Sequence, residues 1–121
     1  MPLIPIYSSK GDADAFLEYP YLFSRHGDWI GFVTQGRDVY SVLGVYVGYL
    51  SNDRRILRKL STATLKPRLA VPPPPAKVYP PATIPLAPLM SELTSSTIDV
   101  LMEEPGRLHP LDTGELREDI D

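Results

Sequence analysis

The chain has 121 residues, the length of one ordinary domain, and contains no cysteine. It can therefore form no disulfide and no cysteine-ligated metal site, and this composition fits a reducing compartment. The net charge of −3 hides an asymmetry, because nine acidic residues but only Arg107 and Arg117 follow residue 90. A basic body with an acidic tail suggests that the tail docks onto the body, within one chain or between copies.

No stretch of the sequence is apolar over the length of a membrane helix. The longest apolar run extends from Val39 to Leu50, whereas a spanning helix needs about 20 residues. The N-terminus lacks the basic start and apolar core of a signal peptide. We therefore expect a cytoplasmic protein without a transmembrane segment.

The first half of the chain repeats a strand-and-turn pattern of roughly 17 residues. Two clear copies fill residues 21–50, a weaker copy precedes them, and a degraded copy runs from Arg55 to Leu65. Glycine-containing turns separate runs of aromatic and β-branched residues, a combination typical of β-hairpins. We expect strands over residues 4–8, 13–17, 21–24, 29–34, 38–41 and 45–50, with a further short strand before residue 65. The fold class is therefore all-β, with about four hairpin repeats.

Several residues recur at equivalent places in the two clear copies, and we expect them to be structural. They are Gly27, Trp29, Gly31, Gly44, Tyr46 and Gly48. The turn glycines supply positive φ, whereas a glycine inside a strand indicates a bend or a close backbone approach. Simple alternation places Trp29 and Val33 on one face and Ile30 and Phe32 on the other. Both faces are apolar, so we expect one to face the centre of the fold and the other to be covered by the tail or a second copy.

A proline-rich tail follows the repeats. Eleven of the 14 prolines lie from Pro67 onward, which predicts an extended polyproline II spacer. We therefore divide the chain into a β-domain over residues 1–66 and a tail over residues 67–121. Residues 95–104 have apolar residues at helical spacing before Pro105-Gly106, which predicts one short helix. The polar, acidic end is expected to be irregular.

Two surfaces are candidates for binding a partner. The predicted helix and its flank carry an apolar docking set, Leu93, Ile98, Leu101 and Met102. This set would bind a protein partner or cap its own domain, and the proline tract is an alternative ligand for an aromatic groove. A basic patch is formed by Arg54, Arg55, Arg58, Lys59 and Arg68. It would bind nucleic acid or protect an exposed strand from aggregation.

No residue pattern indicates catalysis, a cofactor or a metal. His26 and Asp28 share a turn and could do acid–base work, but a solvent-exposed turn is the simpler interpretation. Asp12 and Asp28 occupy equivalent turns and could hold a cation, although aspartate is a common turn residue. We therefore expect a non-enzymatic subunit that binds a protein partner in a larger assembly or by self-association. A nucleic-acid-associated protein is the alternative.

The repeated lines Phe23-Ser24 to Gly27 and Tyr40-Ser41 to Gly44, each followed by an apolar-Gly-aromatic-apolar strand, resemble the bacterial four-fold β-flower proteins. The resemblance covers residues 21–33 and 39–50, with residues 90–102 as the terminal segment. It implies four hairpins around a pseudo-four-fold axis and a proline-rich tail, and it implies no catalytic residue. The fourth copy departs from the pattern, with Ser61 and Leu65 in place of glycines. A weaker likeness is to PRC-barrel domains, which serve as adaptor surfaces.

Overall fold

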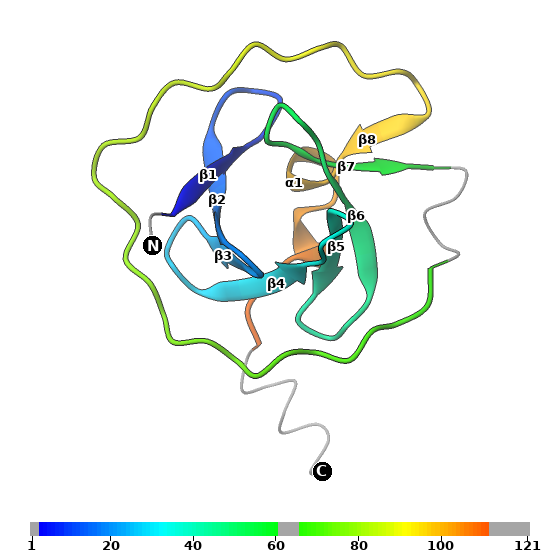
Figure 1. Ribbon diagram of the computed structural model, residues 1–121. Coiled ribbons are helices and arrows are strands. Elements are labelled where there is room, and N and C mark those ends of the chain that lie inside the picture. The colour runs from blue at the N-terminus through cyan, green and yellow to red at the C-terminus, as the bar shows by residue number, and fades with distance from the viewer. Residues whose placement is uncertain (1–2, 61–65, 112–121) are drawn as a thin grey trace.

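The structure is a computed structural model that describes residues 3–60 and 66–111. Its eight strands form one antiparallel sheet in chain order. The sheet curls around a central axis, and residues 66–96 run around its outside (Figure 1). The strands are β1 (Ile4–Tyr7), β2 (Ala13–Glu18), β3 (Tyr21–Ser24), β4 (Trp29–Val33), β5 (Asp38–Ser41), β6 (Tyr46–Leu50), β7 (Ile56–Lys59) and β8 (Thr97–Asp99). The predicted all-β hairpin fold is confirmed.

The first three hairpins share one turn geometry. In each turn, a serine N–H donates to a carbonyl four residues on, from Ser8 to Asp12, from Ser24 to Asp28 and from Ser41 to Val45. The glycine in each turn has positive φ, with 89° at Gly11, 92° at Gly27 and 81° at Gly44. Glycine adopts this conformation without a steric penalty, so the repeated Ser-x-x-Gly is a turn motif.

The fourth hairpin is closed by distant parts of the chain. Strand β7 pairs with β8, and the Leu60 N–H donates to the Ser96 carbonyl at 2.8 Å, as the serines do in the other turns. The sheet thus takes its last strand from residues 97–99, beyond the domain end that the sequence pattern placed at residue 66. The proposed glycine replacements Ser61 and Leu65 lie outside the described residues.

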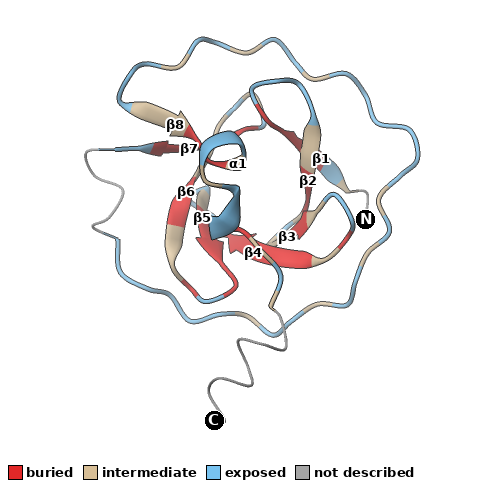
Figure 2. Ribbon diagram, turned by 180° about the vertical axis from the view of Figure 1, so that it is seen from behind, coloured by how far each residue is buried: buried red, intermediate tan, exposed pale blue. Residues whose placement is uncertain are grey.

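A short plug, residues 100–108, follows β8 and fills the axis of the curled sheet. The helix predicted over residues 95–104 begins only at Val100, as α1 (Val100–Glu103), and is followed by η2 (Pro105–Arg107). Thr97 and Ile98 are β-branched, and pairing with β7 satisfies their backbone groups. Val100 and Leu108 are buried in the central cluster together with Ile6, Ala15, Leu17, Leu22, Ile30, Val33, Val39, Val47 and Ile56 (Figure 2).

A β-bulge changes which side chains face the centre. The register between β3 and β4 shifts so that Phe23 pairs with Trp29 but Leu22 pairs with Gly31. Ile30 is the extra residue, and it joins Val33 in the central cluster while Trp29 lies in a second, outer cluster. Simple alternation put Ile30 and Val33 on opposite faces, and that assignment is wrong because a bulge advances the alternation by one residue.

Two glycines inside strands lie against a neighbouring backbone. A Cβ atom at Gly31 would lie 2.4 Å from the Tyr40 carbonyl oxygen, and one at Gly48 would lie 2.3 Å from the Leu57 carbonyl oxygen. Real Cβ atoms do not approach oxygen so closely, so a larger residue would push neighbouring strands apart. The curled sheet therefore depends on glycine at both positions.

We predict that Gly48→Ala lowers the free energy of unfolding by about 1–3 kcal/mol, because the added methyl group overpacks the contact with β7. Gly106→Ala is the matched control, since a Cβ there would meet nothing within 4 Å. Urea unfolding of the two variants measures the difference. Equal stability would contradict the close approach.

Candidate functional site

The most distinctive surface is a belt, defined here as residues 66–96, that encircles the sheet (Figure 1). It contacts the turns of the third, second and first hairpins in that order. The Leu69 N–H donates to the Gly44 carbonyl at 3.1 Å, and the Val78 N–H donates to the Gly27 carbonyl at 3.0 Å. Ala87 lies beside the turn of the first hairpin, 3.9 Å from where a Cβ of Gly11 would stand. These belt positions are nine residues apart, which is about 28 Å of polyproline II helix.

The turn glycines also make room for the belt. A Cβ at Gly27 would lie 1.8 Å from the Val78 carbonyl oxygen, and one at Gly44 would lie 2.4 Å from the Leu69 carbonyl oxygen. Each of these glycines therefore has two roles, because its positive φ shapes the turn and its missing side chain admits the belt.

Tyrosines of the sheet hold carbonyl groups of the belt. The Tyr7 hydroxyl donates to the Pro85 carbonyl at 2.7 Å, and the Tyr21 hydroxyl donates to the Pro73 carbonyl at 2.8 Å. Proline has no N–H, so its carbonyl is the only backbone group through which it can hydrogen-bond. The belt is thus held by its backbone at several points around the sheet.

Charged groups add contacts where the belt starts. Lys66 Nζ lies 2.8 Å from Asp38 Oδ2 and 5.2 Å from the centre of the Tyr46 ring. The hydrogen bond to Asp38 raises the pKa of Lys66, while burial and then the charge of Asp38 raise the pKa of Tyr46. Lys77 lies 3.5 Å from Asp28. Exposed pairs of this kind contribute little free energy, so they orient the belt more than they stabilise it.

The inward and outward sides of the belt differ in burial (Figure 2). Pro72, Pro75 and Val78 are half-buried, at the three-residue spacing of a polyproline II helix. On the outward side, Tyr79 is 84% exposed, and Leu86 and Leu89 are 96% and 99% exposed. The belt therefore presents apolar side chains that its own domain does not cover.

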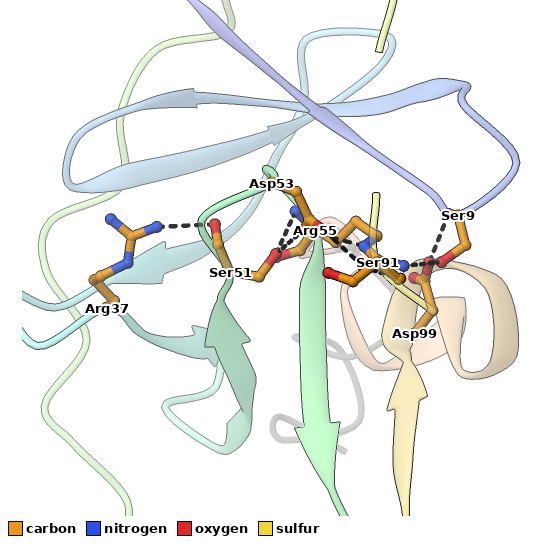
Figure 3. A network of polar contacts seen from close by, with 7 residues as sticks. All are labelled: Ser9, Arg37, Ser51, Asp53, Arg55, Ser91 and Asp99. Carbon is orange, nitrogen blue, oxygen red and sulfur yellow. Dashed lines mark hydrogen bonds and ion pairs between the residues drawn. The ribbon is translucent and has the colours of Figure 1, made fainter. Parts of the chain in front are cut away.

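A buried polar network joins the belt to the two edges of the sheet (Figure 3). Arg55, only 3% exposed, pairs with both oxygens of Asp53 at 3.1 and 2.7 Å. It also donates to the Ser91 carbonyl of the belt and to the Ser9 hydroxyl of the first turn, both at 2.9 Å. Asp99 accepts from the Ser9 N–H and hydroxyl, each at 2.6 Å. The network closes the seam between the fourth and first hairpins.

Two groups of paired charges, one around Asp53 and one around Glu104, keep these carboxylates in the charged form. Burial alone would raise the pKa of Asp53, but hydrogen bonds from Arg55 and Ser51 outweigh it and lower the pKa. In the plug, Glu104 forms an ion pair with buried Arg58 and lies 2.7 Å from Arg107. The hydrogen bond from Arg58 is the main reason why the pKa of Glu104 is lowered. These groups stabilise the fold and are already engaged with one another.

The predicted basic patch does not form one surface. Arg55 and Arg58 are buried and paired with Asp53 and Glu104, because both lie on the buried part of β7 and the turn before it. Arg54, Lys59 and Arg68 remain exposed. Burial leaves the patch without two of its five charges.

The predicted docking set is divided among several places. Ile98 is half-buried in β8, and Leu101 packs against the central cluster. Met102 is exposed, and Leu93 is half-buried within the belt. The tail therefore caps its own domain, which was one of the two alternatives.

Sequence reasoning missed two kinds of site residue. Leu108 was not recognised as a core residue, because it lies alone in a polar segment. The belt anchors were also missed. Leu69, Val78 and Ala87 share a nine-residue spacing that could have been found by comparing the tail with the turn repeat.

The described residues contain no arrangement that indicates catalysis. His26 is exposed in its turn, and Asp28 faces Lys77 of the belt. No group of three or more histidine, aspartate or glutamate side chains in residues 3–60 and 66–111 could hold a metal ion. A groove of about 500 Å³ lies beside the seam, and its polar lining includes Asp53 and Arg55, which already pair with each other.

Comparison with known proteins gives one match. The family model described as 4-fold beta flower protein matches residues 4–98, from β1 through the belt into β8. No curated protein and no solved structure matches significantly. Among the described residues, no helix is long and apolar enough to cross a membrane.

We predict that Gly27→Ala lifts the belt from the second turn, because the methyl group would occupy the place of the Val78 carbonyl. Trypsin should then cut faster after Lys77. Gly36→Ala is the control, since the nearest atom to a Cβ there is 3.8 Å away. Unchanged cleavage in Gly27→Ala would contradict the anchoring role of this turn.

We also predict that Glu104→Gln destabilises the protein by about 2–3 kcal/mol at neutral pH, because it leaves Arg58 buried without its partner. The folded-state pKa of Glu104 is lowered from its ordinary 4.5, so its contribution is complete above pH 4.5 and is lost as the pH falls through the folded-state value. The stability difference from wild type should therefore shrink in acid.

Unfolding by urea at a series of pH values measures this difference. Glu103→Gln is the matched control, since Glu103 is an exposed neighbour in α1. A difference that stays constant down to pH 3 would contradict the ion pair.

Proposed function

The chain belongs to the 4-fold beta flower family, and on this fold we propose that it is a non-enzymatic interaction module that presents its belt to a protein partner. The family match concerns the fold and gives no reaction. The observation that carries the proposal is the outward face of the belt, where Tyr79, Leu86 and Leu89 are almost fully exposed. Leu86 and Leu89 are only three residues apart, and exposed apolar side chains that lie together are typical of interaction sites.

Anchoring makes the belt a better ligand than a free tail would be. Ordering one residue of a free chain costs about 1–2 kcal/mol, and a disordered ligand must overcome this cost when it binds. Here the hydrogen bonds at Gly44, Gly27, Tyr21 and Tyr7 already order the backbone. A partner that binds the belt therefore meets a ligand already in an extended conformation.

The locations of the apolar tail residues favour the belt as the surface that contacts the partner, in place of the docking set expected from the sequence. Ile98 and Leu101 are used by the protein's own domain, as strand and plug. The proline-rich segment, by contrast, leaves Tyr79, Leu86 and Leu89 accessible. The proposal thus keeps a protein partner and moves the contact from residues 93–102 to the belt.

The test is to titrate the full-length protein against isolated SH3, WW and EVH1 domains, which bind polyproline II ligands, and against a duplex DNA of random sequence. We expect saturable binding to at least one such domain with a dissociation constant below about 1 mM. That affinity should change little between about 50 and 200 mM salt, whereas binding through phosphate contacts falls steeply. Steep, salt-dependent binding to DNA alone would overturn the proposal and favour a nucleic-acid role.

A further inference from the structure

Within the proposed function of the belt, on which this inference rests, we propose that residues 84–89 are the ligand segment and that its partner is a groove lined by aromatic side chains. The segment reads Ile-Pro-Leu-Ala-Pro-Leu. Its geometry, anchoring and lack of charge distinguish it from the rest of the belt.

The three-residue period of a polyproline II helix divides this segment into three faces. Ile84, Ala87 and Met90 share the inward face, where Ile84 is 37% exposed and the other two are half-buried. Pro85 and Pro88 share the second face, and Leu86 and Leu89 share the third. Two adjacent faces, one of proline and one of leucine, therefore point away from the protein.

Two contacts fix the inward face against the domain, and they thereby fix the direction in which the outward faces point. Tyr7, which is fully buried, donates its hydroxyl to the Pro85 carbonyl at 2.7 Å. Ala87 lies against Gly11 of the first turn. A groove that accepts polyproline II helices binds alternate ridges of the ligand between aromatic rings. The two exposed faces of residues 84–89 match that requirement, because the protein itself uses only the inward face.

Other parts of the belt fit such a groove less well. In the four-proline tract, Pro72 and Pro75 are half-buried, and the exposed Pro73 and Pro74 carry no large apolar side chain such as leucine. Pro80 is half-buried, and its ring would lie 3.3 Å from a Cβ at Gly27. Leu86 and Leu89 are 96% and 99% exposed, so packing within the domain gives no reason for leucine at either position.

The absence of charge in the segment limits the kinds of partner that could bind it. Residues 78–91 contain no charged side chain. Recognition must therefore come from apolar contact and from hydrogen bonds to backbone carbonyls other than that of Pro85, which Tyr7 already holds. Tryptophan and tyrosine side chains of a groove can donate such hydrogen bonds. A partner that binds through opposite charge would have nothing to pair with here.

The experiment measures the affinity of full-length variants for the domain of the SH3, WW and EVH1 panel that binds wild type most tightly. Leu86→Ser combined with Leu89→Ser should weaken binding about tenfold or more, because it removes the side chains that fill the groove. The control lies in the same belt and is the pair Pro73→Ala with Pro74→Ala. It should bind within about twofold of wild type. Thermal melting should be the same for all variants, since the changed side chains are exposed.

The outcomes of this experiment distinguish a failure of this inference from a failure of the proposed function. If the control loses binding and the double serine variant does not, another part of the belt is the ligand, and only this inference is overturned. If wild type instead forms a concentration-dependent dimer that the double serine variant does not, the leucines bind a second copy and the aromatic-groove partner is overturned. If no domain of the panel binds wild type, both the inference and the proposed function are overturned.

Discussion

The pairing of β7 with β8 is the interaction on which the other features of this protein depend. The chain between these strands is the loop of the fourth hairpin, and it is long enough to encircle the other three. Pairing of Leu57 with Asp99 and Lys59 with Thr97 joins its two ends and makes the belt a closed hoop. The same pairing delivers the plug to the axis, because Val100 follows β8 directly. One ladder thus forms the fourth hairpin, brings the plug to the core and holds the end of the belt at the sheet.

The seam between β1 and β8 explains why the buried charges lie at the edges of the sheet. Strands β1 and β8 are the two edges of the sheet, and no strand ladder joins them in the described residues. Isolated contacts take its place. The Asp99 side chain accepts from the Ser9 N–H and hydroxyl, and the Tyr7 backbone N–H donates to the Arg54 carbonyl at 2.7 Å. A buried carboxylate and guanidinium are costly unless their hydrogen-bonding groups are satisfied. Arg55 and Asp99 meet that condition only when the first turn, the belt and β8 are all in place, so the network selects the closed arrangement.

Local signals predicted the hairpins, whereas the features set by distant contacts were not predictable. The turns around Gly27 and Gly44 were evident because Ser-x-x-Gly encodes its geometry within a few residues. The bulge at Ile30 depends on the partner strand, and alternation alone cannot reveal it. Strand β8 looked helical because Val100 and Leu101 follow it at helical spacing, and its pairing partner lies about forty residues earlier. Arg55 and Arg58 looked like a surface patch because their acidic partners come from a turn and from the plug.

Proline explains how one segment can both brace the domain and remain available to a partner. An extended segment with free N–H groups beside a sheet would pair with an edge strand or with other chains. Prolines such as Pro73 and Pro85 offer only carbonyls, so the belt hydrogen-bonds to tyrosine hydroxyls and forms no ladder with the strands it crosses. The three-residue period then assigns one face to the domain and leaves two faces outside. A sheet strand in the same place would divide its side chains between only two faces, so the polyproline II conformation is what lets the belt be anchored and still display Leu86 and Leu89.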